Sequence, residues 1–189
     1  VDRVLALGGD TDMAAGPFGD ALAMIETGVF DRHGVRQVSL ACYPEVHPRI
    51  PEPALQIALR YKIAALVKRG IEARLVSQFA FSPEPILAFA RELRANGIAA
   101  PLRIGVAGPA SRSTLIRYAM RCGVGASLRA LTGRKSLVGG LMAGETPEAL
   151  LRAVADAVAA DPSLGVEGVH FFTFGAPARS VEWAGSRTG

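Results

Sequence analysis

The chain has 189 residues, half of them apolar, with a formal net charge of +4. This length can bury one hydrophobic core, so we expect a single domain over residues 1–189. The basic residues are scattered rather than clustered with aromatic ones, which argues against a nucleic-acid-binding protein. The apolar runs are too short to span a bilayer, which argues against a membrane protein.

Five short apolar runs predict buried β-strands, and each ends in a glycine or a short polar motif. The runs are Arg3–Gly9, Gln37–Cys42, Arg74–Ser77, Leu102–Ala107 and Val169–Phe174. They are rich in β-branched and aromatic residues and carry apolar side chains on both faces, as strands in a sheet covered by helices do.

The segments between these runs have helical periodicity. We expect helices over residues 20–27, 52–69, 83–96, 111–122 and 146–160, and a last one from about Ala178. Ser82 and Ser111 are the predicted N-caps of two of them, and Gly70 and Gly97 are predicted stop signals. The Gly-rich segment Gly123–Gly144 is expected to be a loop with a short helix.

Strand and helix alternate throughout, which predicts parallel strands joined by right-handed crossovers. An open doubly wound sheet and a closed eight-stranded barrel both fit this order. The chain begins almost directly inside a strand, so we expect an α/β fold of the (βα)8 TIM-barrel type, of which this chain is the last five strands. In such a barrel, functional side chains lie at the carboxyl ends of the strands.

The first strand ends in Gly8-Gly9-Asp10. Glycines at this place let a ligand approach the backbone closely, and the Asp10 carboxylate would point into the barrel mouth. The alternative is that Asp10 caps the following loop or is simply solvated.

The second strand leads into Tyr43-Pro44-Glu45-Val46-His47-Pro48, the most distinctive stretch of the sequence. Its two prolines fix the path of a loop that presents an aromatic ring and an imidazole. We expect Tyr43 to stack on a ligand and His47 to donate a hydrogen bond, for example to a phosphate or carbonyl oxygen. The alternative is a rigid loop whose tyrosine packs beneath the rim of the barrel.

Gln78 follows the third strand, between Ser77 and Phe79. A buried glutamine needs partners for both its oxygen and its NH₂ group, and a heterocyclic ring with alternating donors and acceptors would supply them. The alternative is a glutamine bonded to the backbone at the strand end. The phenylalanines near Gln78 and in the last strand are expected mainly in the core.

Several kinds of site are not indicated. The two cysteines, Cys42 and Cys122, lie far apart in the sequence and the three histidines are not clustered, so we expect no metal site and two reduced cysteines in a cytosolic protein. There is no serine-nucleophile motif and no evident pair of carboxylates for glycoside hydrolysis.

Taken together, these motifs resemble methylenetetrahydrofolate reductases. Residues 4–10, Val-Leu-Ala-Leu-Gly-Gly-Asp, are similar to the family's strand that ends in Gly-Asp, and residues 41–48 match most closely. Residues 77–81 resemble its Thr-Gln-Phe motif, and residues 170–173 its His-Phe-Tyr-Thr strand. The motifs occur in the family's order, span almost the whole chain and correspond to the last five strands of its barrel.

The resemblance implies FAD-mediated hydride transfer from NAD(P)H to 5,10-methylenetetrahydrofolate, giving 5-methyltetrahydrofolate in one-carbon metabolism. It implies Asp10 as the catalytic residue near the flavin and the pterin. The implied cofactor contacts are Gly9, Asp10, Phe18, Gly19, Tyr43, His47 and Lys62. The implied folate contacts are Gln78, Tyr118 and Phe172.

The family's catalytic acid is a glutamate on its first strand, which this chain lacks, as it lacks the FAD contacts of the second and third strands. Two other functions stay open: a relative that passes hydride directly from the nicotinamide to folate without flavin, and a catalytically silent folate- or flavin-binding subunit. The resemblance also implies a cytoplasmic protein that forms homo-oligomers.

Overall fold

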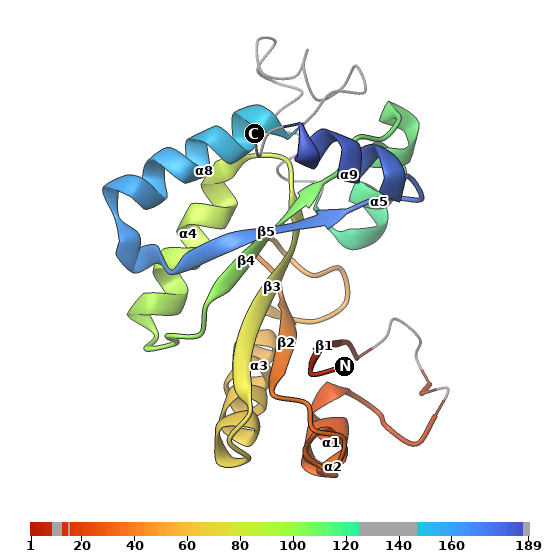
Figure 1. Ribbon diagram of the computed structural model, residues 1–189, viewed down its shortest axis with the longest axis vertical. Coiled ribbons are helices and arrows are strands. Elements are labelled where there is room, and N and C mark those ends of the chain that lie inside the picture. The colour runs from red at the N-terminus through yellow and green to blue at the C-terminus, as the bar shows by residue number, and fades with distance from the viewer. Residues whose placement is uncertain (9–12, 15, 125–146, 187–189) are drawn as a thin grey trace.

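The computed structural model describes residues 1–8, 13–14, 16–124 and 147–186. Five strands form one sheet: β1 (Arg3–Ala6), β2 (Gln37–Cys42), β3 (Glu72–Ala80), β4 (Leu102–Ala107) and β5 (Val166–Phe172). All neighbouring strands are parallel and pair in the order β1-β2-β3-β4-β5, so each strand is bonded to the next one along the chain (Figure 1). The predicted parallel α/β fold is confirmed.

The helices are α1 (Ala21–Glu26), α2 (Val29–Arg32), α3 (Glu52–Lys68), α4 (Pro83–Ala95), α5 (Arg112–Cys122), α8 (Glu148–Ala160) and α9 (Pro177–Gly185), with a 3₁₀ turn η1 (Pro162–Leu164). The sequence did not predict α2 and η1, because segments of four and three residues are too short to show a helical period. None of the helices in the described ranges is both long and apolar enough to cross a membrane.

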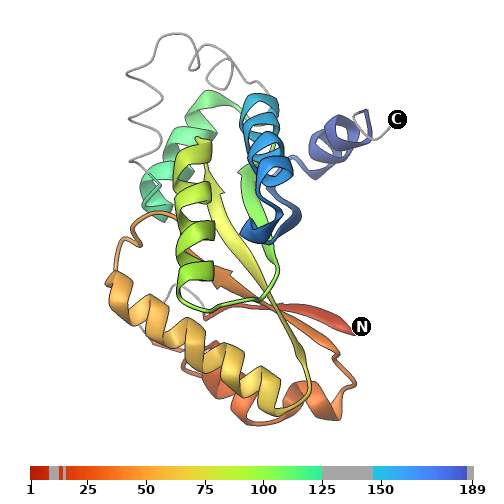
Figure 2. The same cartoon turned by 90° about the vertical axis from the view of Figure 1, so that its left-hand side faces the viewer.

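The main core lies between one face of the sheet and the helices that cover it (Figure 2). Alternate strand residues face this core, because successive side chains of a strand point to opposite faces. The fully buried residues include Val38, Leu40, Leu75 and Ile104 from the strands and Ile25, Leu66 and Ile86 from α1, α3 and α4. The opposite face of the sheet therefore carries the intervening residues, which include charged ones.

The strand order distinguishes between the open doubly wound sheet and the barrel, which both fitted the sequence. A doubly wound sheet reverses its winding direction, so that helices cover both faces. The strands described here run in one direction without reversal, and the main core lies on one side. This winding is compatible with part of a (βα) barrel; closure into eight strands stays a prediction.

Most predicted element ends are close to the observed ones. Asp20 accepts a hydrogen bond from the Ala23 backbone N–H (2.8 Å) and Ser111 from that of Thr114 (3.3 Å), so both cap helices. Ser82 occupies the N-cap position of α4, but its side chain makes no capping bond. The predicted start at Thr146 and nearly all of the predicted loop over 123–144 lie outside the described residues.

Three strands differ in length from their predictions. Strand β1 ends at Ala6, before the predicted end at Gly9. Strand β3 continues past Ser77 to Ala80, because a bulge lets it stay paired with β4. Strand β5 starts three residues earlier than predicted and ends before Phe174, whose φ of +47° takes the backbone out of the extended conformation.

Candidate functional site

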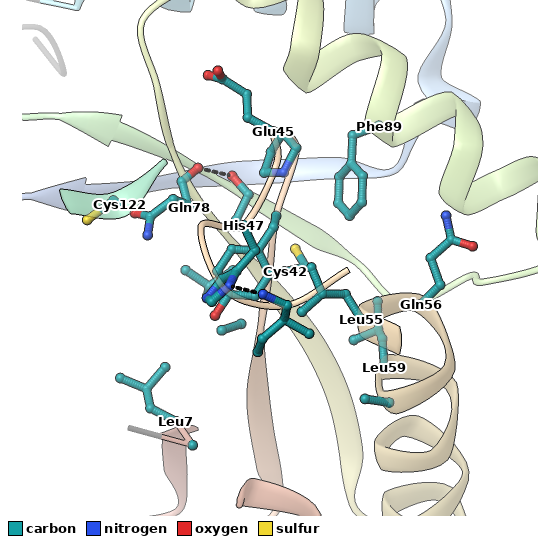
Figure 3. Close-up of a pocket in the computed structure, with 18 of the residues that line it drawn as sticks. Leu7, Cys42, Glu45, His47, Leu55, Gln56, Leu59, Gln78, Phe89 and Cys122 are labelled. Atoms are coloured by element: carbon teal, nitrogen blue, oxygen red, sulfur yellow. Dashed lines mark hydrogen bonds between the residues drawn. The ribbon is translucent and has the colours of Figure 1, made fainter. Parts of the chain in front are cut away.

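A pocket of about 1040 Å³ lies at the carboxyl ends of the strands. Residues that end or follow β1, β2, β3 and β5 line it, together with parts of α3, α4 and α5. Figure 3 shows this convergence: His47 comes from the segment after β2, Gln78 from β3, Leu55 from α3 and Phe89 from α4. Its volume is at the upper end of the range for small-molecule sites, so it can hold a ligand of dinucleotide size.

The loop between β2 and α3 fixes which ring nitrogen of His47 accepts hydrogen bonds. The Nδ1 atom of His47 accepts hydrogen bonds from the backbone N–H groups of Arg49 (3.2 Å) and Ile50 (3.0 Å). A nitrogen that accepts carries no proton, so the neutral ring has its proton on Nε2. The Tyr43 ring packs edge-on against His47, with centroids 4.8 Å apart. His47 therefore presents an N–H donor beside an aromatic ring.

This loop rests closely on the end of α5. Gly123 has a φ of +76°, and a Cβ built there would lie 2.6 Å from the Val46 carbonyl oxygen and 2.9 Å from Pro48 Cδ. Only glycine combines this conformation with so close an approach. The contact fixes the position of the Tyr43–His47 segment relative to α5.

A β-bulge shapes the strand that carries Gln78. Val76 pairs with Arg103 and Phe79 with Gly105, so two residues of β3, Ser77 and Gln78, lie opposite one residue of β4. The Ser77 hydroxyl accepts from the Gly105 N–H at 2.8 Å and donates to the Gln78 carbonyl at 2.9 Å. A Cβ on Gly105 would lie 2.2 Å from the Ser77 carbonyl oxygen, so the bulge requires glycine there.

Gln78 lines the pocket, but its side-chain oxygen already accepts one hydrogen bond within the protein. Its Oε1 accepts a hydrogen bond from the Phe79 backbone N–H at 3.1 Å, which is the strand-end bonding that the sequence left open as the alternative. A carbonyl oxygen has a second lone pair and the NH₂ group has two donors. Gln78 can therefore still donate to and accept from a ligand.

Aromatic rings form one wall of the pocket. Phe79 is buried and contacts Phe172 and Phe174 with centroids 5.3 and 5.1 Å away, and Tyr118 lies 4.7 Å from Phe174. Phe174 holds a positive φ, which is uncommon for a bulky residue and is typical of strained functional segments. The sequence placed Phe174 mainly in the core; its strain was not visible there.

Charged side chains of both signs line the pocket. Lys62 on α3 and Arg49 in the loop between β2 and α3 supply positive charge, and Glu45 and Glu52 supply negative charge. Burial raises the pKa of the nearby Cys42 thiol, so this cysteine is protonated and lines the pocket as an apolar group.

The sheet face opposite the helices carries ion pairs near the amino ends of the strands. Arg74 contacts Glu72 at 2.9 Å and also Glu167, and Arg103 contacts Glu167 at 3.1 Å. Burial raises the pKa of Glu167, but the hydrogen bonds from Arg103 and Arg74 lower it more, so the net shift is downward. Glu167 is itself the extra residue of a bulge opposite β4.

His170 lines the pocket and was not among the predicted site residues, although its motif was recognised. It lies two positions before Phe172 on β5, so both side chains point to the same face of the sheet. This spacing from a predicted site residue is the sequence signal that could have identified it.

The structure brings most predicted site residues together. Gly19, Tyr43, His47, Lys62, Gln78, Tyr118 and Phe172 all line the pocket. Phe18 is partly buried and does not line it. Gly9 and Asp10 lie outside the described residues, so their predicted roles stay predictions.

No protein-family model matches this chain. Within the described ranges, no group of three or more histidine, cysteine, aspartate or glutamate side chains is arranged to hold a metal ion.

Proposed function

We propose that the chain belongs to a flavin-dependent methylenetetrahydrofolate reductase, which transfers hydride from NAD(P)H through FAD to 5,10-methylenetetrahydrofolate. The observation that carries this proposal is that seven residues expected from the resemblance, spread between Gly19 and Phe172, line one pocket. They come from separate βα units, so their convergence depends on the fold and not on closeness in sequence.

The pocket suits a planar heterocycle. Phe172 and Phe174, which pack on the buried Phe79, offer apolar aromatic surface, and His47 and Gln78 offer hydrogen-bonding groups. A pocket lined mainly by apolar and aromatic groups, with a few placed polar ones, is the usual form of a cofactor site.

The residues present fit FAD by the chemistry of their donors. The neutral ring of His47 carries its proton on Nε2 and can donate a hydrogen bond to a flavin or phosphate oxygen. Lys62 lines the same pocket and can neutralise the charge of a phosphate. When bound, FAD supplies the acceptor and donor of hydride between the two substrates. Tyr43 and His47 would hold this cofactor, and Gln78 would orient the pterin.

For hydride transfer the protein's task is to position two rings and exclude water. The loop of Tyr43 and His47 and the bulge beneath Gln78 are suited to this task because hydrogen bonds from backbone N–H groups hold them, and the aromatic wall is held by contacts between its rings. By the resemblance, we propose Asp10 as the carboxylate that tunes flavin and pterin.

The first test is the visible absorption spectrum of the purified full-length protein, followed by identification of the flavin released on denaturation. We expect a flavin spectrum and released FAD, and reduction of the bound flavin by NAD(P)H with reoxidation by methylenetetrahydrofolate. A colourless protein that takes up no added FAD contradicts the proposal. Folate reduction by that colourless protein would indicate direct hydride transfer, and folate binding without turnover would indicate a silent binding subunit.

The resemblance also leads us to propose a cytoplasmic protein that forms homo-oligomers. We propose that the outer face of α3 binds a second copy of the chain. Ala54, Ile57, Tyr61 and Ala64 recur at spacings of three and four, and Ile57 and Tyr61 are 55% and 63% exposed. This is the spacing of a helix-pairing seam.

A further inference from the structure

His170 lines the pocket but is not among the residues expected to contact the cofactor or the folate. Its half-buried side chain lines the pocket, and its ring lies 5.0 Å from that of Phe172 at an interplanar angle of 80°. Among the described residues, neither nitrogen of the imidazole has a hydrogen-bond partner. A half-buried imidazole is only partly accessible to water, so these nitrogens can hydrogen-bond a ligand that enters the pocket.

The neighbouring strands place His170 close to Gln78. His170 pairs with Gly105 in the β4–β5 ladder, and the bulge of β3 lies against the other side of Gly105. Since Gly105 has no side chain, only its backbone separates the strand positions of Gln78 and His170. Both residues line the pocket, from strand positions on either side of Gly105.

The charges around His170 favour its neutral form. Burial lowers the pKa of His170, and the positive charge of Arg103 on β4 lowers it further. Other charged groups on this face include Glu167 on β5 and Arg74 and Glu72 on β3, which pair with one another and with Arg103, and Arg3 on β1, in register with Glu72 through Gln37. A neutral imidazole has one N–H donor and one acceptor nitrogen.

We propose that His170 hydrogen-bonds the polar edge of a planar heterocycle in this pocket, a ring with a cyclic amide of the kind that pterin and isoalloxazine share. Phe172 packs beside it and gives the ring an apolar contact, and Gln78 supplies a second polar partner across Gly105. This inference rests on the proposed function, because it concerns the ligands of the same site.

The test compares the wild-type full-length protein with His170→Phe, which keeps a ring against Phe172 and removes the hydrogen bond, and with His170→Gln, which restores a donor and an acceptor. Affinities for FAD and for 5-methyltetrahydrofolate are measured by fluorescence titration, and melting temperatures verify folding. We expect His170→Phe to weaken binding of one ligand by about threefold to tenfold, the effect of one hydrogen bond, and His170→Gln to recover part of it. Long-range ¹⁵N NMR of the imidazole should show one nitrogen shifting when that ligand binds.

An effect on FAD alone assigns the contact to isoalloxazine, and an effect on the folate alone assigns it to the pterin. Unchanged affinity of folded His170→Phe for both ligands overturns the inference but leaves the proposed function intact. A wild-type protein that binds neither ligand overturns both. His33→Phe is the matched control, because His33 is exposed and does not line the pocket.

Discussion

The hydroxyl of Ser77 accepts a hydrogen bond from the backbone N–H of Gly105 and so fastens the bulge of β3 to β4. Without this bond, the Gly105 N–H would be buried without a partner at a break in the regular ladder. The bulge carries Gln78, so the position of a pocket residue depends on a serine and a glycine beside it.

Gly105→Ala should strongly destabilise the protein. The new Cβ would lie 2.2 Å from the Ser77 carbonyl oxygen and 2.8 Å from backbone atoms of Gln78, so one strand must move. We expect a loss of about 3 kcal/mol or more in the free energy of unfolding, measured with urea. Gly168→Ala on β5 is the control: nothing lies within 4 Å of its Cβ, and its effect should stay within about 1 kcal/mol.

Gly123→Ala should displace the loop that carries Tyr43 and His47. Gly97→Ala is its matched control, because both glycines have a positive φ, +76° and +74°, but only Gly123 is in close contact with the loop. Both substitutions should cost about 1–2 kcal/mol for the left-handed conformation. Gly123→Ala should cost about 1–3 kcal/mol more and weaken FAD binding. Equal losses in the two variants would show that the loop contact is unimportant.

His47→Asn should separate the two roles of this histidine. The Asn oxygen lies close to the place of Nδ1 and can keep the bonds from Arg49 and Ile50, whereas no group replaces Nε2–H. We expect a small fall in melting temperature, because the ring contact with Tyr43 is lost, and FAD affinity reduced about threefold to tenfold. Full FAD affinity in this variant would exclude His47 as a cofactor donor.

The free energy of unfolding should fall in acid, partly because Glu167 becomes protonated. Its folded-state pKa lies below the ordinary 4.5, so its stabilising effect is complete above pH 4.5 and is lost as the pH falls through the folded value. Urea unfolding between pH 3 and pH 7 should give a flatter profile for Glu167→Gln. Glu148→Gln should leave the profile almost unchanged, because its pair with Arg152 is exposed. Identical slopes for wild type and Glu167→Gln would contradict this role.

Tyr61→Glu should convert the proposed oligomer to monomers. A carboxylate in the centre of the α3 seam would face its own copy in an antiparallel pair, which is unfavourable by charge and desolvation. Light scattering after size-exclusion chromatography measures the mass directly. His33→Glu is the exposed control. A wild-type protein that is already monomeric at micromolar concentration would refute the α3 interface.

The sequence predicted the strands, and it predicted Tyr43, His47 and Gln78 as site residues, because both have local signals. Apolar runs such as Gln37–Cys42 and Leu102–Ala107 mark buried strands at the bounds observed. Parallel strands place their carboxyl ends at one edge, so the loop with Tyr43 and the strand with Gln78 had to meet there.

The remaining features depend on pairing between strands, which has no local signal. The bulge at Ser77 exists only relative to β4, and Arg74 meets Glu167 across 93 positions of sequence. His170 becomes a pocket residue only when β5 is placed beside Gly105. These relationships could not be derived from spacing along the chain.

The sequential order of the sheet also determines how the chain can fold. Each ladder joins strands that are consecutive in sequence, so β1–β2, β2–β3 and β3–β4 can each form by closing one βα segment. The β4–β5 ladder must close the longest segment, which includes α5 and α8. We therefore expect β5, and with it His170 and Phe172, to join the sheet late. The pocket would then be complete only when the final strand has paired.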